Sequence, residues 1–529
     1  MLKRPASILA ASAIAACLAC SKPASRTPAK DTLYRHLDGD PPSLDPITTS
    51  EEIGTRVEEL IFRPLLGVDR ELRPVPSLAR TWAASSDGLV YDFRLDPSAR
   101  WDDGSPITSA DVAYTIERVR DPKVPAVNWR WGFEDVAKVE TPDPLTVILH
   151  FEHPYADRLF AFNVSIVSAA AFRKDAQSQG RHPMGSGPYR LESWEPNQNI
   201  TLLRRADSPA ERYAFSKVVF RVIPDNAVRF RAGLRGELDE FRVTRDQRPV
   251  AEKSEEFLKH NRLLKAPQFS IVMLIYNCRH PFLSDRRVRQ ALGLAWPRQT
   301  TAMRLYPPDG AKLISGPYPA GAAEIAPDVK PPEQNIDAAA RLLDQAGWKA
   351  GPDGSRRRGK EKASIELLYP AGLPAYASIA QILQQGYAKV GVELKLRALD
   401  WAACSERIAA GEFDVAPEGN TFLPPHLDQY LYFHSRQTPP DGQNFGFYKN
   451  PEADRVMEEA QREMDSTRRL ELYHRLHRIL ASDPPADFLW SAEQYWGVSR
   501  SLAGVETSPL GLFHFLPGSL GWKPVAPSR

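Results

Sequence analysis

The chain contains only four cysteines among its 529 residues. Beyond the first 20 residues only Cys278 and Cys404 remain, far apart in the sequence. This spacing offers neither a disulfide framework nor a paired-cysteine zinc motif. A single long-range bridge is one reading of the pair, but two unrelated buried thiols are the favoured one.

Long apolar runs and a strong charge imbalance are also missing. No stretch of about 18 or more apolar residues occurs after residue 20, so the mature chain is not expected to cross a membrane by itself. The formal net charge is +2, and loss of a leader carrying Lys3 and Arg4 would bring it close to zero. Such a balance gives no electrostatic argument for a nucleic-acid partner, so none is expected.

Motifs for bond chemistry are absent as well. The sequence has no HExxH, no GxGxxG after a strand and no P-loop. Ser186 lies between glycines, but Pro188 opposes the turn that a serine nucleophile needs. His474 and His477 have a spacing that suits a metal, yet no third ligand accompanies them, which favours surface histidines. We therefore predict no enzyme, no cofactor and no metal site.

The N-terminus, by contrast, carries a clear signal. Residues 1–20 combine a basic start with a short apolar run and end on cysteine, which is typical of a secretory leader. The four residues ending at Cys17 resemble a bacterial lipobox, whereas Cys20 has a poorer box but a more polar tether after it, at 21–31. Either cysteine would be the lipid anchor, and an uncut anchor or a plain export signal is the alternative.

The rest reads as an α/β protein. Its length implies about three to four packing units, and 42% hydrophobic and 25% charged residues are ordinary for a globular chain. A capping box at 108–111 precedes a helix, and residues 365–398 read as strand, helix and strand with parallel pairing. Helices are also expected at 52–66, 336–346, 451–463 and 467–481. The basic run 356–362 reads as a solvated hairpin.

Aromatic residues gather in turn-rich segments. Each one alone is as well explained by a core position, but several on loops between two bodies would line a ligand cleft. They are Trp129, Trp131, Trp401, Tyr430, Tyr432, Phe433, Phe445, Phe447 and Tyr448.

Several motifs, in order along the chain, resemble those of the large extracytoplasmic solute-binding proteins of ABC importers, family 5, the oligopeptide, dipeptide and nickel group. The resemblance covers nearly everything after residue 32. The segments that carry it are 42–46, 76–82, 86–95, 101–112, 185–189, 281–292 and 450–454.

This resemblance implies the two-lobed periplasmic-binding-protein fold of class II, the large cluster C type, with mixed sheets and an extra domain on the N-terminal lobe. Lobe I would comprise 32–66, 183–266 and 488–529. The accessory domain would be 67–182, and lobe II would be 267–487, with hinge crossings near 266 and 487.

The family's ligand contacts carry over only at aligned positions. Asp40 and Pro41 fall on a ligand-touching turn, Tyr276 and Asn277 on a strand near the hinge, and Trp401 on an aromatic wall. Peptide-binding relatives place a tryptophan and then an aspartate for the peptide ammonium where this chain has Asn420 and Leu423. His426 and Asp428 would replace that aspartate only if the loop shifts, so the usual peptide anchoring is in doubt.

The function implied is capture of a peptide or peptide-like solute by a monomer through hinge closure, followed by delivery to an ABC permease. The location would be the periplasm or cell surface, on a lipid anchor. Alternatives are a sensor of the same fold that signals to a membrane partner, or a binder of a non-peptide solute; a secreted hydrolase is the least favoured.

Overall fold

The computed structural model describes residues 31–525, apart from 50, 127, 268–269, 307–310, 372–373, 422–426 and 441. Cys17, Cys20, Leu423 and His426 lie outside the described residues, and at Asn420 only the backbone is described. No helix in the described part of the chain is long and apolar enough to cross a membrane.

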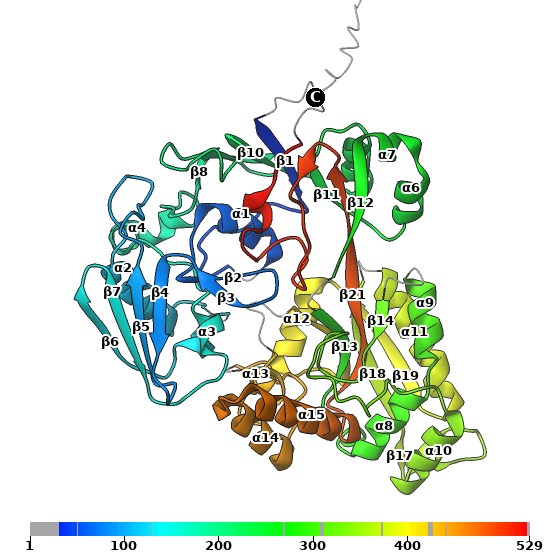
Figure 1. Ribbon diagram of the computed structural model, residues 1–529. Helices are drawn as coiled ribbons and strands as arrows, with labels where there is room; N and C mark the ends of the chain where they lie inside the picture. Colours follow the sequence, from blue (N-terminus) through cyan, green and yellow to red (C-terminus); the bar gives the residue numbers. More distant parts are fainter. Residues whose placement is uncertain are drawn as a thin grey trace, which may run out of the picture.

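The described chain forms an upper and a lower lobe, with a four-stranded domain beside the upper one (Figure 1). Each part has its own buried hydrophobic clusters. Separate cores allow the parts to move as rigid bodies, so the α/β two-lobed architecture expected from the sequence is confirmed.

The upper lobe is built on a mixed sheet around β1 (Thr32–Leu37), which pairs in parallel with β10 (Lys217–Val222). β10 alternates buried apolar residues with partly exposed ones, as a half-buried strand requires, whereas β1 buries Arg35 and His36 as well as Leu33 and Leu37. The other elements of this lobe are α1 (Glu52–Ile61), β8 (Tyr189–Glu195), β9 (Asn199–Arg204), α5 (Asn226–Leu234), β11 (Glu240–Val243), α6 (Arg248–Lys253), α7 (Glu255–His260), β12 (Asn261–Pro267), β22 (Leu502–Ala503), η2 (Gly518–Gly521) and β23 (Lys523–Pro524).

The four-stranded domain is an antiparallel sheet in the order β4-β5-β7-β6. Helix α2 (Ser109–Arg120) begins at the predicted capping box, in which Thr108 and Asp111 bond each other's backbone. The strands are β4 (Ala79–Ala84), β5 (Val90–Leu95), β6 (Val136–Asp143) and β7 (Thr146–Phe151), and the short elements around them are β2 (Leu66–Val68), β3 (Pro74–Pro76), η1 (Arg130–Gly132), α3 (Arg158–Ala161) and α4 (Ala169–Gln179).

In the lower lobe, β18 (Ser364–Pro370), α11 (Pro374–Lys389) and β19 (Glu393–Leu399) form the predicted strand–helix–strand unit, and the two strands are parallel. Helix α10 (Ile336–Gln345) is followed by Gly347 at φ +85°, which stops the helix as expected. The remaining elements are β13 (Ser270–Tyr276), α8 (Arg286–Leu294), α9 (Arg298–Leu305), β14 (Ala311–Leu313), β15 (Lys349–Ala350), β16 (Arg356–Arg358), β17 (Glu361–Lys362), α12 (Trp401–Ala410), β20 (Val415–Thr421), α13 (Tyr430–Phe433), α14 (Pro451–Arg462) and α15 (Ser466–Ser482).

One long strand joins the lobes. The first part of β21 (Ala486–Ser499) pairs with β13 in the lower lobe, and its last part pairs with β11 and β12 in the upper lobe. β12 and β13 follow each other in sequence and lie on opposite sides of the same boundary. The lobes are thus linked by backbone that can bend without disturbing either core.

Several local expectations have clear outcomes. Cys278 and Cys404 are free thiols, and Cys404 is buried. The basic run forms the β16–β17 hairpin, although Arg356 is buried and pairs with Asp344 at 2.8 Å.

The surface-histidine reading of the pair on α15 was wrong for His477. That ring is fully buried, and it accepts a hydrogen bond from the backbone N–H of Ala326 at 2.9 Å. Its partner His474 contacts the carbonyl oxygen of Ala323 at 2.8 Å. Both rings therefore fasten the 315–326 segment to α15, a tertiary role that helical spacing could not reveal.

Candidate functional site

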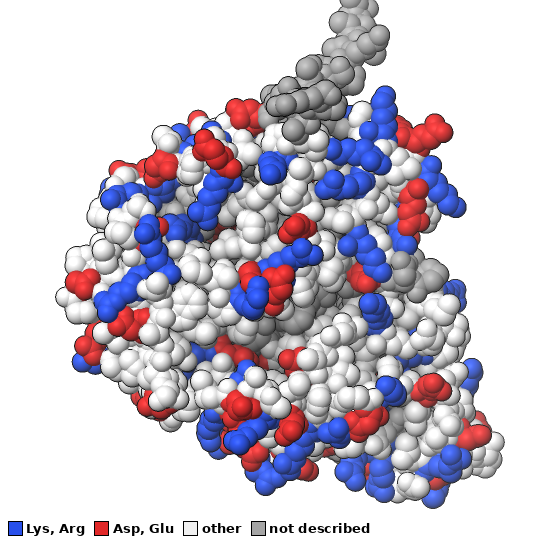
Figure 2. All heavy atoms as spheres, in the orientation of Figure 1, with Lys and Arg blue, Asp and Glu red and all other residues white. Residues whose placement is uncertain are grey.

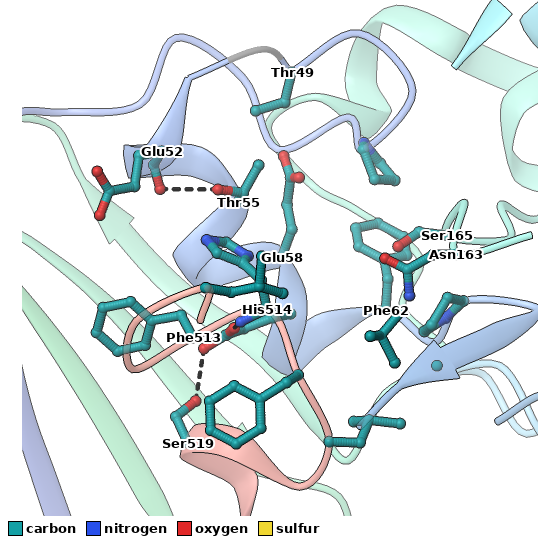
Figure 3. A pocket seen from close by; sticks show the side chains of 18 of the residues that line it. Thr49, Glu52, Thr55, Glu58, Phe62, Asn163, Ser165, Phe513, His514 and Ser519 are labelled. Carbon is teal, nitrogen blue, oxygen red and sulfur yellow. Dashed lines mark hydrogen bonds between the residues drawn. The ribbon is translucent and has the colours of Figure 1, made fainter. Parts of the chain in front are cut away.

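A cavity of about 320 Å³ lies where α1, the four-stranded domain and the C-terminal loop 510–520 meet. We call it the α1 cavity. Among the described residues, no lysine or arginine lines it. Its polar lining residues include Thr49, Glu51, Glu52, Thr55, Glu58, Glu59, Asn128, Asn163, Ser165, Gln494, His514 and Ser519 (Figure 3).

Helix α1 reaches this cavity because its residues divide by helical spacing. Val57, Leu60 and Ile61 enter the hydrophobic core. Thr55, Glu58 and Phe62 recur at the same period on another side and line the cavity. A helix with two such faces carries its carboxylates to the boundary between core and cavity.

Aromatic rings make the apolar walls. Phe62, Trp129, Phe513 and Phe515 line the cavity from three separate parts of the chain. The indole N–H of Trp129 donates to the carbonyl oxygen of Pro46 at 3.2 Å, which fixes the ring between the upper lobe and the four-stranded domain. Aromatic walls with a few polar groups are typical of small-ligand sites.

Two of the glutamates are held by partners. Glu52 accepts two hydrogen bonds from Arg242, at 3.0 and 3.1 Å. Glu59 accepts from the hydroxyl of Ser519 at 2.6 Å and from the backbone N–H of His514 at 3.1 Å. These two carboxylates are therefore satisfied by the protein itself.

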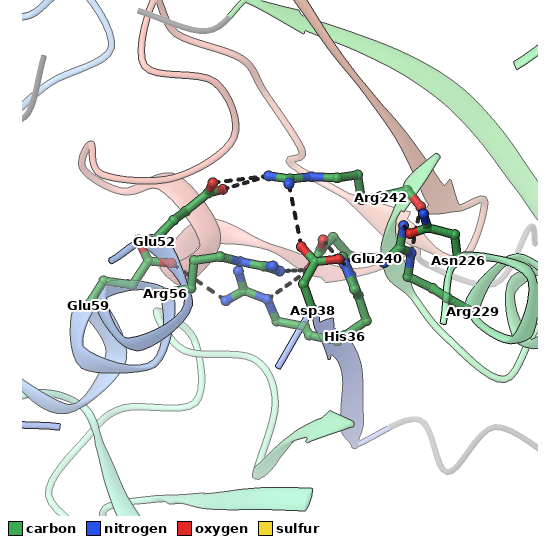
Figure 4. Close-up of polar contacts among 10 residues, drawn as sticks. His36, Asp38, Glu52, Arg56, Glu59, Asn226, Arg229, Glu240 and Arg242 are labelled. Atoms are coloured by element: carbon green, nitrogen blue, oxygen red, sulfur yellow. Dashed lines mark hydrogen bonds and ion pairs between the residues drawn. The ribbon is translucent and has the colours of Figure 1, made fainter. Parts of the chain in front are cut away.

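Behind Glu52 lies a buried network of charges (Figure 4). Glu240 is fully buried and accepts from Arg35 at 3.1 Å and Arg56 at 2.6 Å. Burial alone would raise the pKa of Glu240, but Arg56, His36 and Arg35 outweigh it and hold the pKa at about 2. The carboxylate therefore stays ionised as part of the fold.

Glu58 has a different environment. Its side chain is 5% exposed, and atom Oε1 has no hydrogen-bond partner among the described residues. Burial, with a smaller contribution from the carboxylates of Glu51 and Asp45, raises the pKa of Glu58 to about 8, although a hydrogen bond with Thr49 acts to lower it. At neutral pH this carboxyl group is largely protonated while the cavity holds no cation.

His514 completes this wall from a strained backbone. Its φ of +65° lies in the left-handed region, which a residue with a side chain occupies at a cost. Burial lowers its pKa below the usual value of 6.5, against the pull of Glu59 and Glu52, so the ring is neutral at pH 7. Strain of this kind is found at ligand sites more than elsewhere.

A second hollow, of about 1130 Å³, separates the four-stranded domain from the lower lobe. We call it the interdomain crevice. Trp131 and Tyr155 line it from one side, and Tyr430, Phe445 and Phe447 from the other. Figure 2 shows this face of the molecule hollowed between the lobes, with positive and negative side chains interspersed around it. Of the nine predicted aromatic residues, four line this crevice, Trp131, Tyr430, Phe445 and Phe447, and Trp129 lines the α1 cavity. Phe433 and Tyr448 are instead core residues of the lower lobe, and Trp401 and Tyr432 line neither hollow.

Direct contacts bridge this crevice. The hydroxyl of Tyr155 donates to Asp428 Oδ2 at 3.1 Å, and the backbone N–H of Ala156 donates to the carbonyl oxygen of Gln461 at 2.8 Å. Asp157 lies 3.8 Å from Arg469. Burial raises the pKa of Asp157 to about 6, with Arg469 opposing. The structure thus has the four-stranded domain docked on the lower lobe.

Asp428 is committed to that docking. Besides Tyr155 it accepts hydrogen bonds from the side chain of Gln461 at 2.7 Å and from the backbone N–H of Tyr430 at 2.9 Å. Its carboxylate is buried and already saturated. It therefore stabilises the interface rather than standing in for the aspartate absent at Leu423.

The predicted site residues of the upper lobe lie on one turn. Asp40 accepts a hydrogen bond from the indole of Trp194 at 2.9 Å and lies 3.9 Å from Arg181. Pro41 is buried beside it. Neither residue lines either of the hollows described above, so a ligand contact here stays a prediction.

The predicted residues of the lower lobe separate into two groups. Tyr276 is fully buried in the hydrophobic core of the lobe. Asn277 donates to the carbonyl oxygens of Phe413 at 2.8 Å and Gly411 at 3.2 Å, which ties two loops together. The positions of both favour packing and bracing.

Trp401 is 62% exposed at the start of α12, where Asp400 caps the helix. Asn420 lies on β20, paired with Ile271 of β13. Both remain predicted ligand contacts. Sequence alone does not identify Glu58 or His514. The one available signal is the two glutamate pairs at 51–52 and 58–59, at the start of α1 and near its end, a pattern that ordinary surface helices also show.

The fold and these hollows define a two-lobed binding protein with a hinge between its lobes. The family model described as bacterial extracellular solute-binding proteins, family 5 Middle, matches residues 73–441. The chain therefore belongs to family 5 of the solute-binding proteins, as its motifs indicated.

Relatives agree over most of the chain. The oligopeptide-binding protein AppA of Bacillus subtilis is 26% identical over 497 residues, 89% of this chain and 88% of its own length. The probable D,D-dipeptide-binding periplasmic protein DdpA of Escherichia coli is 25% identical, over 91% of this chain and 92% of its own. NikZ of Campylobacter jejuni, solved with Ni(L-His), superposes with a TM-score of 0.82 at 23% identity, over 93% of this chain and 99% of that one.

Proposed function

We propose that this protein captures a peptide or peptide-like solute between its lobes and delivers it, chemically unchanged, to an ABC permease. The observation that carries the proposal is the pair of aromatic-lined hollows at the junctions of three separately cored parts. Relatives named for oligopeptide and D,D-dipeptide binding support the solute class. Affinities on the order of 1 μM would suit capture followed by release.

Hinge closure is the proposed mechanism. A solute that contacts both lobes binds the closed state better than the open one, and that difference in affinity shifts the population. Tyr155 and Asp157 join the four-stranded domain to the lower lobe, and we expect opening of the hinge to break these contacts. These contacts stabilise the closed state without a ligand.

The domain boundaries remain the ones expected from the sequence, with lobe I at 32–66, 183–266 and 488–529, the accessory domain at 67–182 and lobe II at 267–487. The protein would work as a monomer on a lipid anchor at Cys17 or Cys20, in the periplasm or at the cell surface. Asp40, Pro41, Trp401, Asn420, Leu423 and His426 remain the proposed ligand contacts, with Tyr276 and Asn277 behind them.

Native mass spectrometry of protein purified from its own host, combined with small-angle scattering, tests this function. We expect a co-purified small molecule, and a smaller radius of gyration when it or a matching peptide is added back. Unchanged scattering with every bound compound would contradict hinge closure, and turnover of a bound compound would contradict a transport role.

A second function deserves the same assay. A sensor of the same fold would close in the same way but would signal to a membrane partner, and Leu423 in place of the usual aspartate keeps a non-peptide solute open. Co-purification with a permease rather than with a signalling protein separates the two roles.

A further inference from the structure

Glu58 is a buried acid whose hydrogen-bonding capacity the protein leaves partly unused. Atom Oε1 has no partner among the described residues, although buried polar atoms normally find one. The side chain lines the α1 cavity, and in Figure 3 it runs from α1 toward Thr49, between Glu52 and Thr55 on one side and Asn163 and Ser165 on the other. An unsatisfied carboxyl oxygen at the wall of a cavity indicates a missing donor.

The surroundings specify the charge of that donor. No arginine or lysine lines the cavity in the part of the chain that the structure describes, so this lining offers Glu58 no cation. The neighbouring acids already have partners: Asp45 accepts from Arg118 at 2.5 and 2.9 Å, Glu52 from Arg242, and Glu59 from Ser519. A buried carboxyl oxygen of this lining that has no donor among the described residues favours a positively charged donor on the ligand.

The aromatic walls of the cavity indicate what kind of group carries that positive charge. Phe62, Trp129 and Phe515 supply ring faces and edges, and ring faces attract cations as well as apolar chains. Phe513 is backed by Arg56, whose guanidinium carbon lies 4.5 Å from the ring centre, so that ring is already occupied on one side. A volume of about 320 Å³ holds an amine with a short apolar stem.

We propose that the α1 cavity receives a protonated primary amine of the solute and that Glu58 is the residue that selects it. The inference rests on the proposed function and names the substrate class of that site. The amine is either the α-ammonium of a peptide or a lysine-type side-chain ammonium, because both present the same charge and the same three donors.

Binding of a cation at Glu58 has a measurable proton balance. The carboxyl group of the empty cavity holds a proton at pH 7, because burial raises its pKa to about 8. An ammonium favours the ionised form, so the proton leaves to solvent as the amine binds. Affinity for a lysine-type ammonium, whose pKa is about 10.4, therefore rises from about pH 6 to pH 8 and levels off above it. Affinity for a peptide α-ammonium, whose own pKa is about 8, rises over the same range and falls above pH 8, where the amine loses its charge.

The other titratable groups facing Glu58 do not reproduce this effect. Asp45 is paired with Arg118, and Glu52 with Arg242. His514 is neutral at pH 7 because burial lowers its pKa, so it has no proton to release there. Glu51, the remaining neighbour, is tested separately by Glu51→Gln.

The test uses two peptide pairs and isothermal titration. One pair is the tripeptide Phe-Ala-Ala with a free and with an acetylated N-terminus; the other is N-acetyl-Ala-Ala-Lys and its norleucine analogue. Wild-type protein should bind the charged member of at least one pair about 30-fold more tightly or better, the usual scale for losing a buried charge partner. The preferred pair tells which amine enters the cavity.

Glu58→Gln should abolish that preference while the protein remains folded, because glutamine keeps the shape of the neutral acid. The exposed Glu471→Gln serves as the matched control and should keep the preference. Titrations in two buffers of different ionisation enthalpy should show proton release near pH 7 in wild type and little in Glu58→Gln. This readout in wild type holds even if a variant folds poorly.

Three results would overturn the inference. If wild-type protein bound the charged and the uncharged peptide of each pair equally, the cavity would not select an ammonium group, but the proposed solute-binding function would stand. Full retention of the preference in Glu58→Gln would assign it to another residue. If none of the peptides bound wild-type protein, both the proposed peptide-like solute and the proposed role of Glu58 would be contradicted.

Discussion

Glu240 and Glu58 are both buried acids of the upper lobe, and they have opposite pKa shifts. The pKa of Glu240 is held at about 2 because Arg56, Arg35 and His36 surround it. The pKa of Glu58 rises to about 8 because it faces the α1 cavity, where no arginine or lysine lines the wall. The difference shows that burial alone does not define a carboxylate's role; its partners do.

The contrast follows from where arginines enter the lobe. Arg56 comes from α1 itself, Arg35 from β1 and Arg242 from β11, and all three face the network side of the helix. The cavity side meets the turn that precedes α1, the four-stranded domain, Gln494 and the C-terminal loop, none of which brings an arginine or lysine to the described lining. One helix therefore separates charges that hold the fold from a charge that is left for a ligand.

Removing the network carboxylate should have the largest effect. Glu240→Gln leaves Arg35 and Arg56 buried beside each other without their anion, and loss of one partner from a buried pair typically costs about 3–5 kcal/mol. We expect a lower free energy of unfolding at pH 7, measured by urea denaturation followed by tryptophan fluorescence.

The matched control is Asp328→Asn, which removes an exposed ion pair with Arg478. It should leave the unfolding midpoint unchanged, since exposed pairs contribute little. Equal midpoints for Glu240→Gln and wild type would show that the network is dispensable.

The next effect is on pH dependence. The pKa of Glu58 is raised from 4.5 in the unfolded chain to about 8, so its contribution to stability is full below pH 4.5 and is lost as pH rises through 8. Glu58→Gln has no such loss, so between pH 5 and pH 9 its free energy of unfolding should rise relative to that of wild type by a few kcal/mol. Thermal unfolding at both values measures it.

Glu240→Gln should change pH dependence in the opposite sense. The pKa of Glu240 is depressed, so its contribution is present above pH 4.5 and disappears as pH falls toward 2. The difference in free energy of unfolding between wild type and Glu240→Gln should become smaller at acidic pH. The corresponding difference for Glu58→Gln should become larger at basic pH. If the two variants showed the same dependence of unfolding free energy on pH, Glu58 and Glu240 would not have opposite pKa shifts.

A smaller effect is expected at the interdomain crevice. Tyr155→Phe removes the donor to Asp428 and leaves a buried carboxylate less satisfied, at a cost of about 1–3 kcal/mol. Since this contact joins two parts rather than one core, we expect mainly a wider ensemble, seen as a larger radius of gyration without ligand. Unchanged scattering would place the contact outside the closure mechanism.

The smallest effect on stability should come from Trp401→Ala. The ring is 62% exposed and packs little, so the unfolding temperature should stay within about 1 °C of wild type, in line with surface substitutions. A weaker affinity for the solute with unchanged stability would support the predicted aromatic wall. Unchanged affinity would remove Trp401 from the site.

The sequence alone determined much of this protein. Local rules sufficed for the capping box at Thr108, the stop at Gly347 and the parallel β18–β19 unit, because neighbouring residues decide helix ends and crossovers. Ordered motifs were enough for the family. Local sequence did not separate the aromatic residues that line the hollows, such as Trp131 and Phe447, from those that lie in the core, such as Phe433 and Tyr448.

Tertiary structure alone decided which of the glutamates at α1 a distant side chain holds. Four glutamates lie at positions 51, 52, 58 and 59, and nothing in that run tells one from another. Glu52 is neutralised by an arginine 190 positions away, and Glu59 is held by a serine 460 positions away. Glu58 receives no such partner, because the chain folds a cavity rather than a charged side chain against it. Long-range packing, which no local pattern encodes, makes that choice.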